Sequence, residues 1–187
     1  MVYMQLKIKK LRENARVPKR ATNGSAGMDL YACIDEAITL APGQLAVIPT
    51  GIAIELPDNT CAAFLYARSG LGVKHGICLS NGVGVVDSDY RGEICAGLCN
   101  VSDKPYVIEP DERVAQMVIA PVLTPEIIEA DELGDTDRGE GDFGSTGKHR
   151  AAAADSSTNF RCNNFWNRYH TNRNAKEPKL CFHFQRI

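Results

Sequence analysis

The chain has 187 residues, a hydrophobic fraction of 44% and a formal net charge of −2 at neutral pH. This length favours one globular domain with an appendage, and a domain of about 150 residues buries enough surface to fold without disulfides or a structural metal. The small charge gives no indication of a nucleic-acid partner, no apolar run approaches the roughly 18 residues of a membrane span, and the first residues lack the apolar stretch of a signal peptide.

Residues 1–133 are predicted to form a β-rich core. Breaks recur roughly every 8–12 residues, which is typical of a β-sandwich or barrel. Leu71–Gly76 is expected to be a short helix or a loop. Gly82–Val86 and Glu93–Leu98 flank the polar stretch Asp87–Gly92 and are expected to pair as a hairpin. The full set of expected strands is Leu45–Pro49, Ile52–Leu56, Cys61–Tyr66, Gly82–Val86, Glu93–Leu98, Tyr106–Ile108, Arg113–Ile119 and Glu126–Ala130.

Two segments of different composition follow this core. Residues 134–147 contain five glycines and one aromatic residue, so they cannot form a core and are expected to act as a flexible lid that orders over a ligand. Residues 148–187 lose the strand pattern; after Lys148 their net charge is near +5, whereas residues 1–148 carry about −7. This basic tail is predicted to be disordered.

The seven cysteines lie singly within the chain, and none forms a CxxC pair. A zinc site is therefore not expected. Most of the cysteines are predicted to be small buried hydrophobic residues in a reducing compartment, which indicates a cytoplasmic protein.

Five segments contain candidates for chemistry, and each candidate also has a purely structural interpretation. Asp87 is either a turn former or a carboxylate base. Arg68 offers paired donors to phosphate oxygens, although it also suits a surface turn. Asn81 precedes a glycine, as in many turns. Gln116 lies in an apolar strand, where its amide needs a polar partner. The segments are residues 26–32, 67–72, 82–93, 113–118 and 138–147.

These segments, in this order, resemble the five motifs of the trimeric dUTP diphosphatase family, and the resemblance extends over residues 5–147. It implies an all-β fold, a distorted jelly-roll or β-barrel with a flexible C-terminal lid. It also implies a homotrimer with active sites at subunit interfaces. The implied reaction is Mg²⁺-assisted hydrolysis of dUTP to dUMP and pyrophosphate, which supplies dUMP for thymidylate synthesis and keeps uracil out of DNA.

The resemblance also assigns roles to residues. Asp87 is expected to activate the water that attacks the α-phosphate, and Asp29 to hold Mg²⁺ through water. Tyr90 is expected to pack under the deoxyribose and exclude a 2′-hydroxyl. The uracil edge is expected to be read by Asn81, Gly84, Val85, Val86 and Cys95, largely through main-chain groups, with Phe143 stacked on the base. The phosphates are expected to be bound by Arg68, Ser69, Gly70, Gln116, Arg138, Gly144, Ser145 and Thr146.

The chain departs from the family pattern at three places. Ala67 stands where a proline is common. Asp142 replaces the glycine before Phe143, so a carboxylate enters a lid meant for a triphosphate and is expected to weaken its closure. The tail has no recognised counterpart and is either a read-through end or a true extension. A dCTP deaminase of the same fold, and a nucleotide-gated regulatory protein with the tail as its partner-binding arm, are the alternatives.

Overall fold

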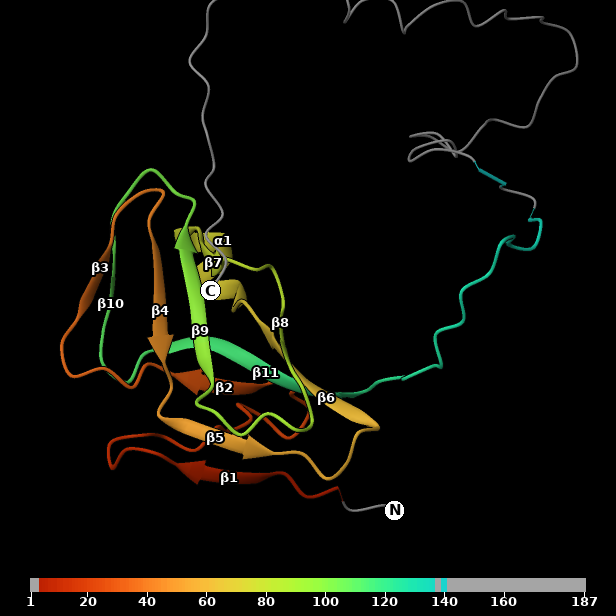
Figure 1. Cartoon of the computed structure of the whole chain (residues 1–187). Helices are drawn as coiled ribbons and strands as arrows, with labels where there is room; N and C mark the ends of the chain where they lie inside the picture. The colour runs from red at the N-terminus through yellow and green to blue at the C-terminus, as the bar shows by residue number, and fades with distance from the viewer. Residues whose placement is uncertain (1–3, 137–138, 141–187) are drawn as a thin grey trace, which may run out of the picture. The chain divides into compact units, whose positions relative to one another are not determined.

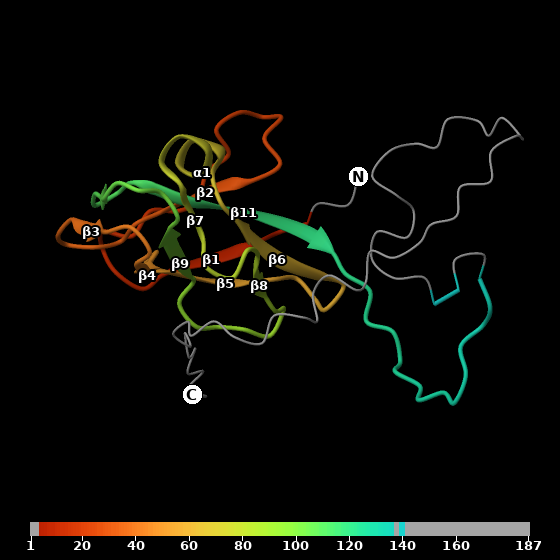
Figure 2. The same cartoon turned by 90° about the horizontal axis from the view of Figure 1, so that it is seen from above.

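The computed structural model describes residues 4–136 and 139–140 of the chain (Figures 1 and 2). The chain divides after Glu129 into two units, and the first of them holds the elements below. In chain order they are β1 (Lys7–Lys10), β2 (Met28–Tyr31), β3 (Ile38–Leu40), β4 (Leu45–Pro49), β5 (Ile52–Glu55), β6 (Cys61–Tyr66), α1 (Ser69–His75), β7 (Ile77–Leu79), β8 (Gly84–Val86), β9 (Cys95–Asn100), β10 (Tyr106–Ile108) and β11 (Arg113–Pro121).

Two antiparallel sheets carry most of the first unit, as Figure 1 shows. One has the strand order β2-β11-β6-β8, and the other has the order β4-β9-β7; β1 pairs with β5 and β3 pairs with β10. Their inner faces bury apolar side chains, among them Leu30, Ile48, Leu65, Leu98 and Met117. These side chains form one hydrophobic cluster, which is the core that fixes the sheets.

Most of the predicted strands are confirmed, but the predicted hairpin is wrong. β8 pairs with β6, whereas β9 pairs with β4 and β7, so the two strands belong to different sheets. Asp87–Gly92 therefore links two sheets instead of closing a two-stranded ribbon. The alternation of apolar residues identifies a strand but does not specify the strand edge that it joins.

The predicted strand at Glu126–Ala130 is also wrong. No strand hydrogen bonds form there, and the apolar side chains of Leu123 and Ile127 are each 95% exposed. Within the part of the chain that the structure describes, no sheet edge accepts this segment. Exposed apolar side chains of this kind are available to pack against another surface.

The cysteines are less buried than predicted. Cys33 and Cys61 are buried, Cys78 and Cys99 are half-buried, and Cys95 is exposed, so the prediction fails for three of the five described cysteines. Residues on alternate positions of β9 point to opposite faces, and all three less buried cysteines lie on the outer side of the β4-β9-β7 sheet.

The helix α1 is short. It begins directly after Arg68 and ends at Gly76, whose φ of 68° is left-handed and whose N–H caps the last turn by donating to the Gly72 carbonyl. The sequence predicted either a short helix or a loop here, and the structure has a helix. No helix among the described residues is long and apolar enough to cross a membrane.

Candidate active site

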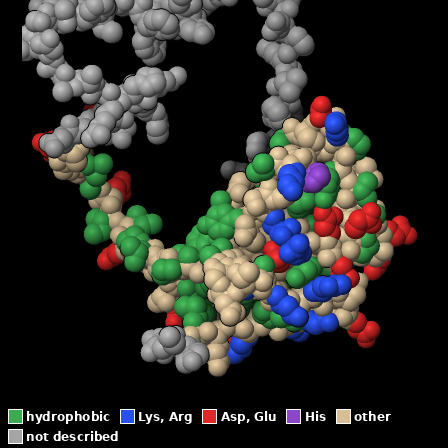
Figure 3. All heavy atoms as spheres, turned by 180° about the vertical axis from the view of Figure 1, so that it is seen from behind, with side chains coloured by type: hydrophobic (Ala, Val, Ile, Leu, Met, Phe, Trp, Pro, Cys, Tyr) green, Lys and Arg blue, Asp and Glu red, His purple; other side chains and the backbone are tan. Residues whose placement is uncertain are grey.

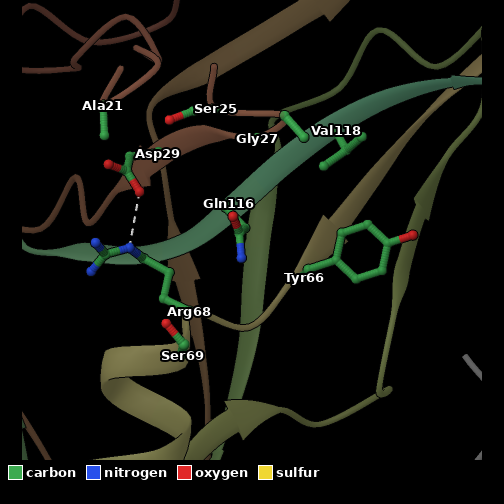
Figure 4. A pocket seen from close by; sticks show the side chains of 10 residues that line it. Ala21, Ser25, Gly27, Asp29, Tyr66, Arg68, Ser69, Gln116 and Val118 are labelled. Carbon is green, nitrogen blue, oxygen red and sulfur yellow. Dashed lines mark hydrogen bonds and ion pairs between the residues drawn. The ribbon is translucent and has the colours of Figure 1, made fainter. Parts of the chain in front are cut away.

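A first pocket, of about 370 Å³, lies where β2, β6 and β11 meet the start of α1 (Figure 4). We call it the Arg68 pocket. Asp29, Tyr66 and Gln116 face it from the three strands, because Gln116 pairs directly with Asp29 on one side and with Tyr66 on the other. Directly opposed residues of antiparallel strands share a face, so this register gathers the three side chains together.

Asp29 organises two arginines at this pocket. Its Oδ1 accepts a hydrogen bond from Arg68 Nε at 2.9 Å, and its Oδ2 accepts one from Arg113 Nη1 at 3.2 Å. The Asp29 side chain is only 12% exposed, so its charge is compensated by two guanidinium groups. Arg68 Nη1 also donates to the Arg113 carbonyl oxygen at 3.2 Å. The Nη2 of Arg68 makes no hydrogen bond to any described residue.

Gln116 has the polar partner that its apolar strand requires. Its Nε2 donates to the Ala67 carbonyl oxygen at 3.0 Å, directly before the Arg68 motif. The other end of the amide packs against Gly27, where an added Cβ would lie 2.8 Å from Oε1. A glycine at position 27 is therefore needed for the Gln116 side chain to keep this position.

A second pocket, of about 300 Å³, lies between β8, the linking segment after it and the start of β9. We call it the Asp87 pocket. Asp87 is exposed and its carboxylate makes no hydrogen bond to the described residues. Tyr90 Oη donates to the Glu93 carbonyl oxygen at 3.0 Å, and Glu93 Oε1 accepts the Gly51 N–H at 2.8 Å. The lining includes the seven residues that the sequence assigned to the uracil edge, the sugar and activation of the water: Asn81, Gly84, Val85, Val86, Asp87, Tyr90 and Cys95.

The two pockets share no lining residue, and the Asp87 pocket lies at β8, the edge strand of its sheet. Tyr66 lines the Arg68 pocket, and its neighbour in β6, Leu65, lines the Asp87 pocket. The structure therefore brings the predicted site residues together as two separate groups within a single chain.

Some predicted residues join neither group. Gly70 lies exposed in α1 and lines neither pocket, and an added Cβ there would meet nothing within 4 Å. The sequence reasoning missed Tyr66 and Glu93; the position of Tyr66 directly before the Ala67-Arg68 motif was the available signal. The residues Arg138, Asp142, Phe143, Gly144, Ser145 and Thr146 lie outside the described residues.

Comparison with known proteins places these features in a family. A dUTPase family model matches residues 13–147. The deoxyuridine 5′-triphosphate nucleotidohydrolase of Desulfitobacterium hafniense is 52% identical over 132 residues, which cover 71% of this chain and 87% of that protein. Its counterpart in Paraburkholderia phytofirmans is 50% identical over 146 residues, covering 78% and 99%.

Solved structures agree. A mutant dUTPase of Staphylococcus bacteriophage 80alpha with dUpNHpp has a TM-score of 0.69 and 30% identity, covering 76% of this chain and 98% of that one. A mutant dUTPase of the S. aureus phage phi11, described with a structural Mg(II) ion, has a TM-score of 0.63 and 26% identity, covering 70% and 99%. The all-β, jelly-roll-like fold expected from the sequence is confirmed, and the family model and the named relatives place the chain among enzymes that act on a nucleotide. The chain belongs to the dUTPase family.

Proposed function

We propose that this enzyme hydrolyses dUTP to dUMP and pyrophosphate, with Asp87 as the general base. The observation that carries the proposal is the Asp87 pocket, where a carboxylate that makes no hydrogen bond to the described residues lies beside Tyr90 and the main chain of β8. In the step we propose, Asp87 takes a proton from water as the water oxygen attacks the α-phosphorus, and pyrophosphate leaves with the bridging oxygen. The dUMP formed would supply thymidylate synthesis, and removal of dUTP would keep uracil out of DNA.

The nucleoside half of dUTP fits the Asp87 pocket. We propose that the Asn81 amide and the main chain of Gly84, Val85, Val86 and Cys95 read the uracil edge. A base with the wrong donors would leave buried polar groups unpaired, which is a strong source of selectivity. An added Cβ on Gly84 would lie 3.0 Å from Leu65 Cβ, so the main chain here already packs closely against β6.

The triphosphate half fits the Arg68 pocket. We propose that Arg68 binds phosphate oxygens, that Ser69 hydrogen-bonds the oxygen bridging the α- and β-phosphates, and that Gln116 binds phosphate or the attacking water. Gly70, with open space around it, allows the main chain to approach the substrate. The assignments to Arg138, Phe143, Gly144, Ser145 and Thr146 rest on the family match, which reaches residue 147.

The side chains available as metal ligands at the Arg68 pocket limit how it can hold Mg²⁺. The described residues contain no group of three His, Cys, Asp or Glu side chains that could hold a metal. Asp29 already accepts two hydrogen bonds, although each carboxylate oxygen has a further lone pair. This set fits a Mg²⁺ ion held mainly by substrate phosphates and water, with Asp29 accepting hydrogen bonds from that water. When bound, Mg²⁺ neutralises triphosphate charge.

We further propose that the enzyme is a homotrimer whose active sites combine the Asp87 pocket of one chain with the Arg68 pocket of another. The support is geometric: within one chain the two pockets share no lining residue, and the Asp87 pocket lies at the edge strand β8. Apolar surface is also available for contacts between copies. Tyr66, Val85 and Leu123 are exposed by 38%, 60% and 95%, and Figure 3 shows hydrophobic side chains gathered on one side of the body.

The substrate is tested by measuring pyrophosphate release from dUTP, dCTP, dTTP and UTP. We expect kcat/KM for dUTP to exceed that for each other nucleotide by at least about 100-fold, because unpaired polar groups penalise a wrong base. Ammonia release from dCTP is measured in parallel. Ammonia from dCTP with no pyrophosphate from dUTP would identify the deaminase alternative and refute the proposal.

Sugar selectivity gives a second prediction. A Cβ on Gly92 would lie 2.6 Å from Tyr90 Cζ, so Gly92→Ala must displace the tip of the Tyr90 ring. Because that ring is the proposed barrier to a 2′-hydroxyl, we expect the preference for dUTP over UTP to fall at least about tenfold, the effect of about 1.4 kcal/mol. The melting temperature should change little, because the ring tip can rotate away. An unchanged dUTP to UTP ratio would show that Tyr90 does not select the sugar.

A further inference from the structure

Two cysteines outside the proposed active site lie in direct contact. Cys78 of β7 and Cys99 of β9 are directly opposed in the antiparallel register, and their Sγ atoms are 3.2 Å apart. Both side chains are half-buried. Leu45 of β4 pairs with Cys99 from the other side and is 70% exposed, so solvent reaches this face of the sheet within the described chain.

The backbone at this pair suits a disulfide, but a strained one. The Val101 N–H donates to the Gly76 carbonyl and the Ser80 N–H to the Gly97 carbonyl, both at 2.9 Å. Hydrogen-bonded and non-hydrogen-bonded pairs alternate along an antiparallel ladder, so Cys78 and Cys99, midway between these two bonds, form a hydrogen-bonded pair. The Cα atoms of such a pair are about 5.5 Å apart, which is within the disulfide range. Opposed Cβ atoms are about 4.5–5.5 Å apart and a disulfide needs about 3.5–4.5 Å, so the two strands must draw together.

The other described cysteines lack this arrangement. Cys33 is buried and donates to Asn14 Oδ1 at 3.2 Å, and Cys61 is buried and contacts the Asp58 carbonyl. Cys95 is on the same strand as Cys99 but four residues away, opposite Pro49. Among the described residues, Cys78 and Cys99 are therefore the pair of thiols placed to react with each other.

We propose that Cys78 and Cys99 are a redox modification site, at which a small-molecule disulfide such as oxidised glutathione forms a reversible Cys78–Cys99 disulfide. One thiol, after losing its proton, attacks the small disulfide and releases one thiol product. The second cysteine, also deprotonated, displaces the other half and releases the second thiol product. Two cysteine thiols and one small disulfide thus give one protein disulfide and two small thiols, and strain makes the protein disulfide easily reduced.

The disulfide encloses the nucleoside-binding part of the chain. The closed loop runs from residue 78 to residue 99 and contains Asn81, Asp87 and Tyr90, which line the Asp87 pocket. Drawing β7 and β9 together shifts Asn81, two residues beyond β7, relative to the start of β9. The oxidised enzyme is therefore expected to bind nucleotide more weakly, because small displacements of positioning groups have large effects. This expectation rests on the proposed function.

The experiment uses the full chain, equilibrated in buffers of reduced and oxidised glutathione, with free thiols then alkylated. Trypsin places Cys78 in the peptide 75–91 and Cys99 in the peptide 92–113, because Pro105 blocks cleavage after Lys104. Mass spectrometry detects the linked peptides, and fragmentation tells Cys99 from Cys95. The affinity for dUpNHpp is measured on the same samples, so binding is read without turnover.

We expect the Cys78–Cys99 link in the oxidised wild-type enzyme, with affinity for dUpNHpp at least threefold lower and restored by dithiothreitol. Cys78→Ser and Cys99→Ser should bind dUpNHpp like the reduced wild-type enzyme in every buffer. If Cys78→Ser folds poorly, Cys78→Ala is used in its place. Absence of the linked peptides, or linked enzyme with unchanged affinity, overturns the proposal. A reduced enzyme that does not hydrolyse dUTP would instead refute the proposed function, while the link is still read from the peptides.

Discussion

Asp87→Asn is expected to lower kcat for dUTP by about 10²- to 10⁴-fold, the usual contribution of a general base. Asparagine keeps the shape of the side chain but cannot take the proton from water. KM should stay within about threefold, because the proposed loss is confined to the transition state. The fold should be unaffected, since the Asp87 carboxylate makes no hydrogen bond to the described residues. Steady-state pyrophosphate release, with a thermal melt of each variant, measures both effects.

Asp89 supplies the matched control. It is an exposed carboxylate two residues away in the same linking segment, but it does not line the Asp87 pocket. Asp89→Asn makes the same chemical change, and its kcat should stay within about twofold of the wild-type value, as expected away from the reacting groups. Equal losses in the two variants would point to local charge instead of a base, and no loss in Asp87→Asn would remove Asp87 from the mechanism.

The strands that the sequence predicts well are short apolar runs between turn residues. β4 and β6 begin and end where predicted, because Gly51 and Pro57 mark breaks near them and their residues alternate or are buried. β1 was missed because Lys7–Lys10 holds three lysines and its side chains are largely exposed. Such a strand is held by pairing with β5, and pairing partners are not visible in a local pattern.

The site shows the same limit. The sequence supplied seven of the ten residues that line the Asp87 pocket, because those seven are close together in sequence, but it did not supply Leu65, Glu93 or Ile94. The motifs did not supply the contact of Asp29 with Arg68, which are 39 positions apart, or that with Arg113, 84 positions away. Nor did they show that the site residues form two separate groups within one chain. Contacts of this kind depend on strand register, which is fixed only when the whole core is packed.

That separation leads to a prediction about mixed oligomers. Asp87→Asn alone and Arg68→Ala alone should each be nearly inactive, because each removes one half of every site. If a site takes its Asp87 pocket from one chain and its Arg68 pocket from another, co-expressing the two variants in equal amounts should restore about a quarter of wild-type activity. In a random closed assembly, the chain that supplies the Asp87 pocket has an intact Asp87 with a probability of one half, and the chain that supplies the Arg68 pocket has an intact Arg68 with the same probability. The two probabilities multiply to one quarter.

The matched control places both substitutions in one chain and co-expresses it with the wild-type chain. If sites are shared, this pair of chains should again give about a quarter of full activity. If each chain contains its own site, this pair should give about half, and co-expression of the two single variants should give no recovery. Activity is measured on the unfractionated mixture, to which the random-assembly fractions apply, and differently tagged chains, purified over both tags in turn from a portion of it, confirm that mixed assemblies form. Recovery near zero, with mixed assemblies present, would show that one chain completes its own site. Because the two pockets share no lining residue within one chain, recovery is the expected result.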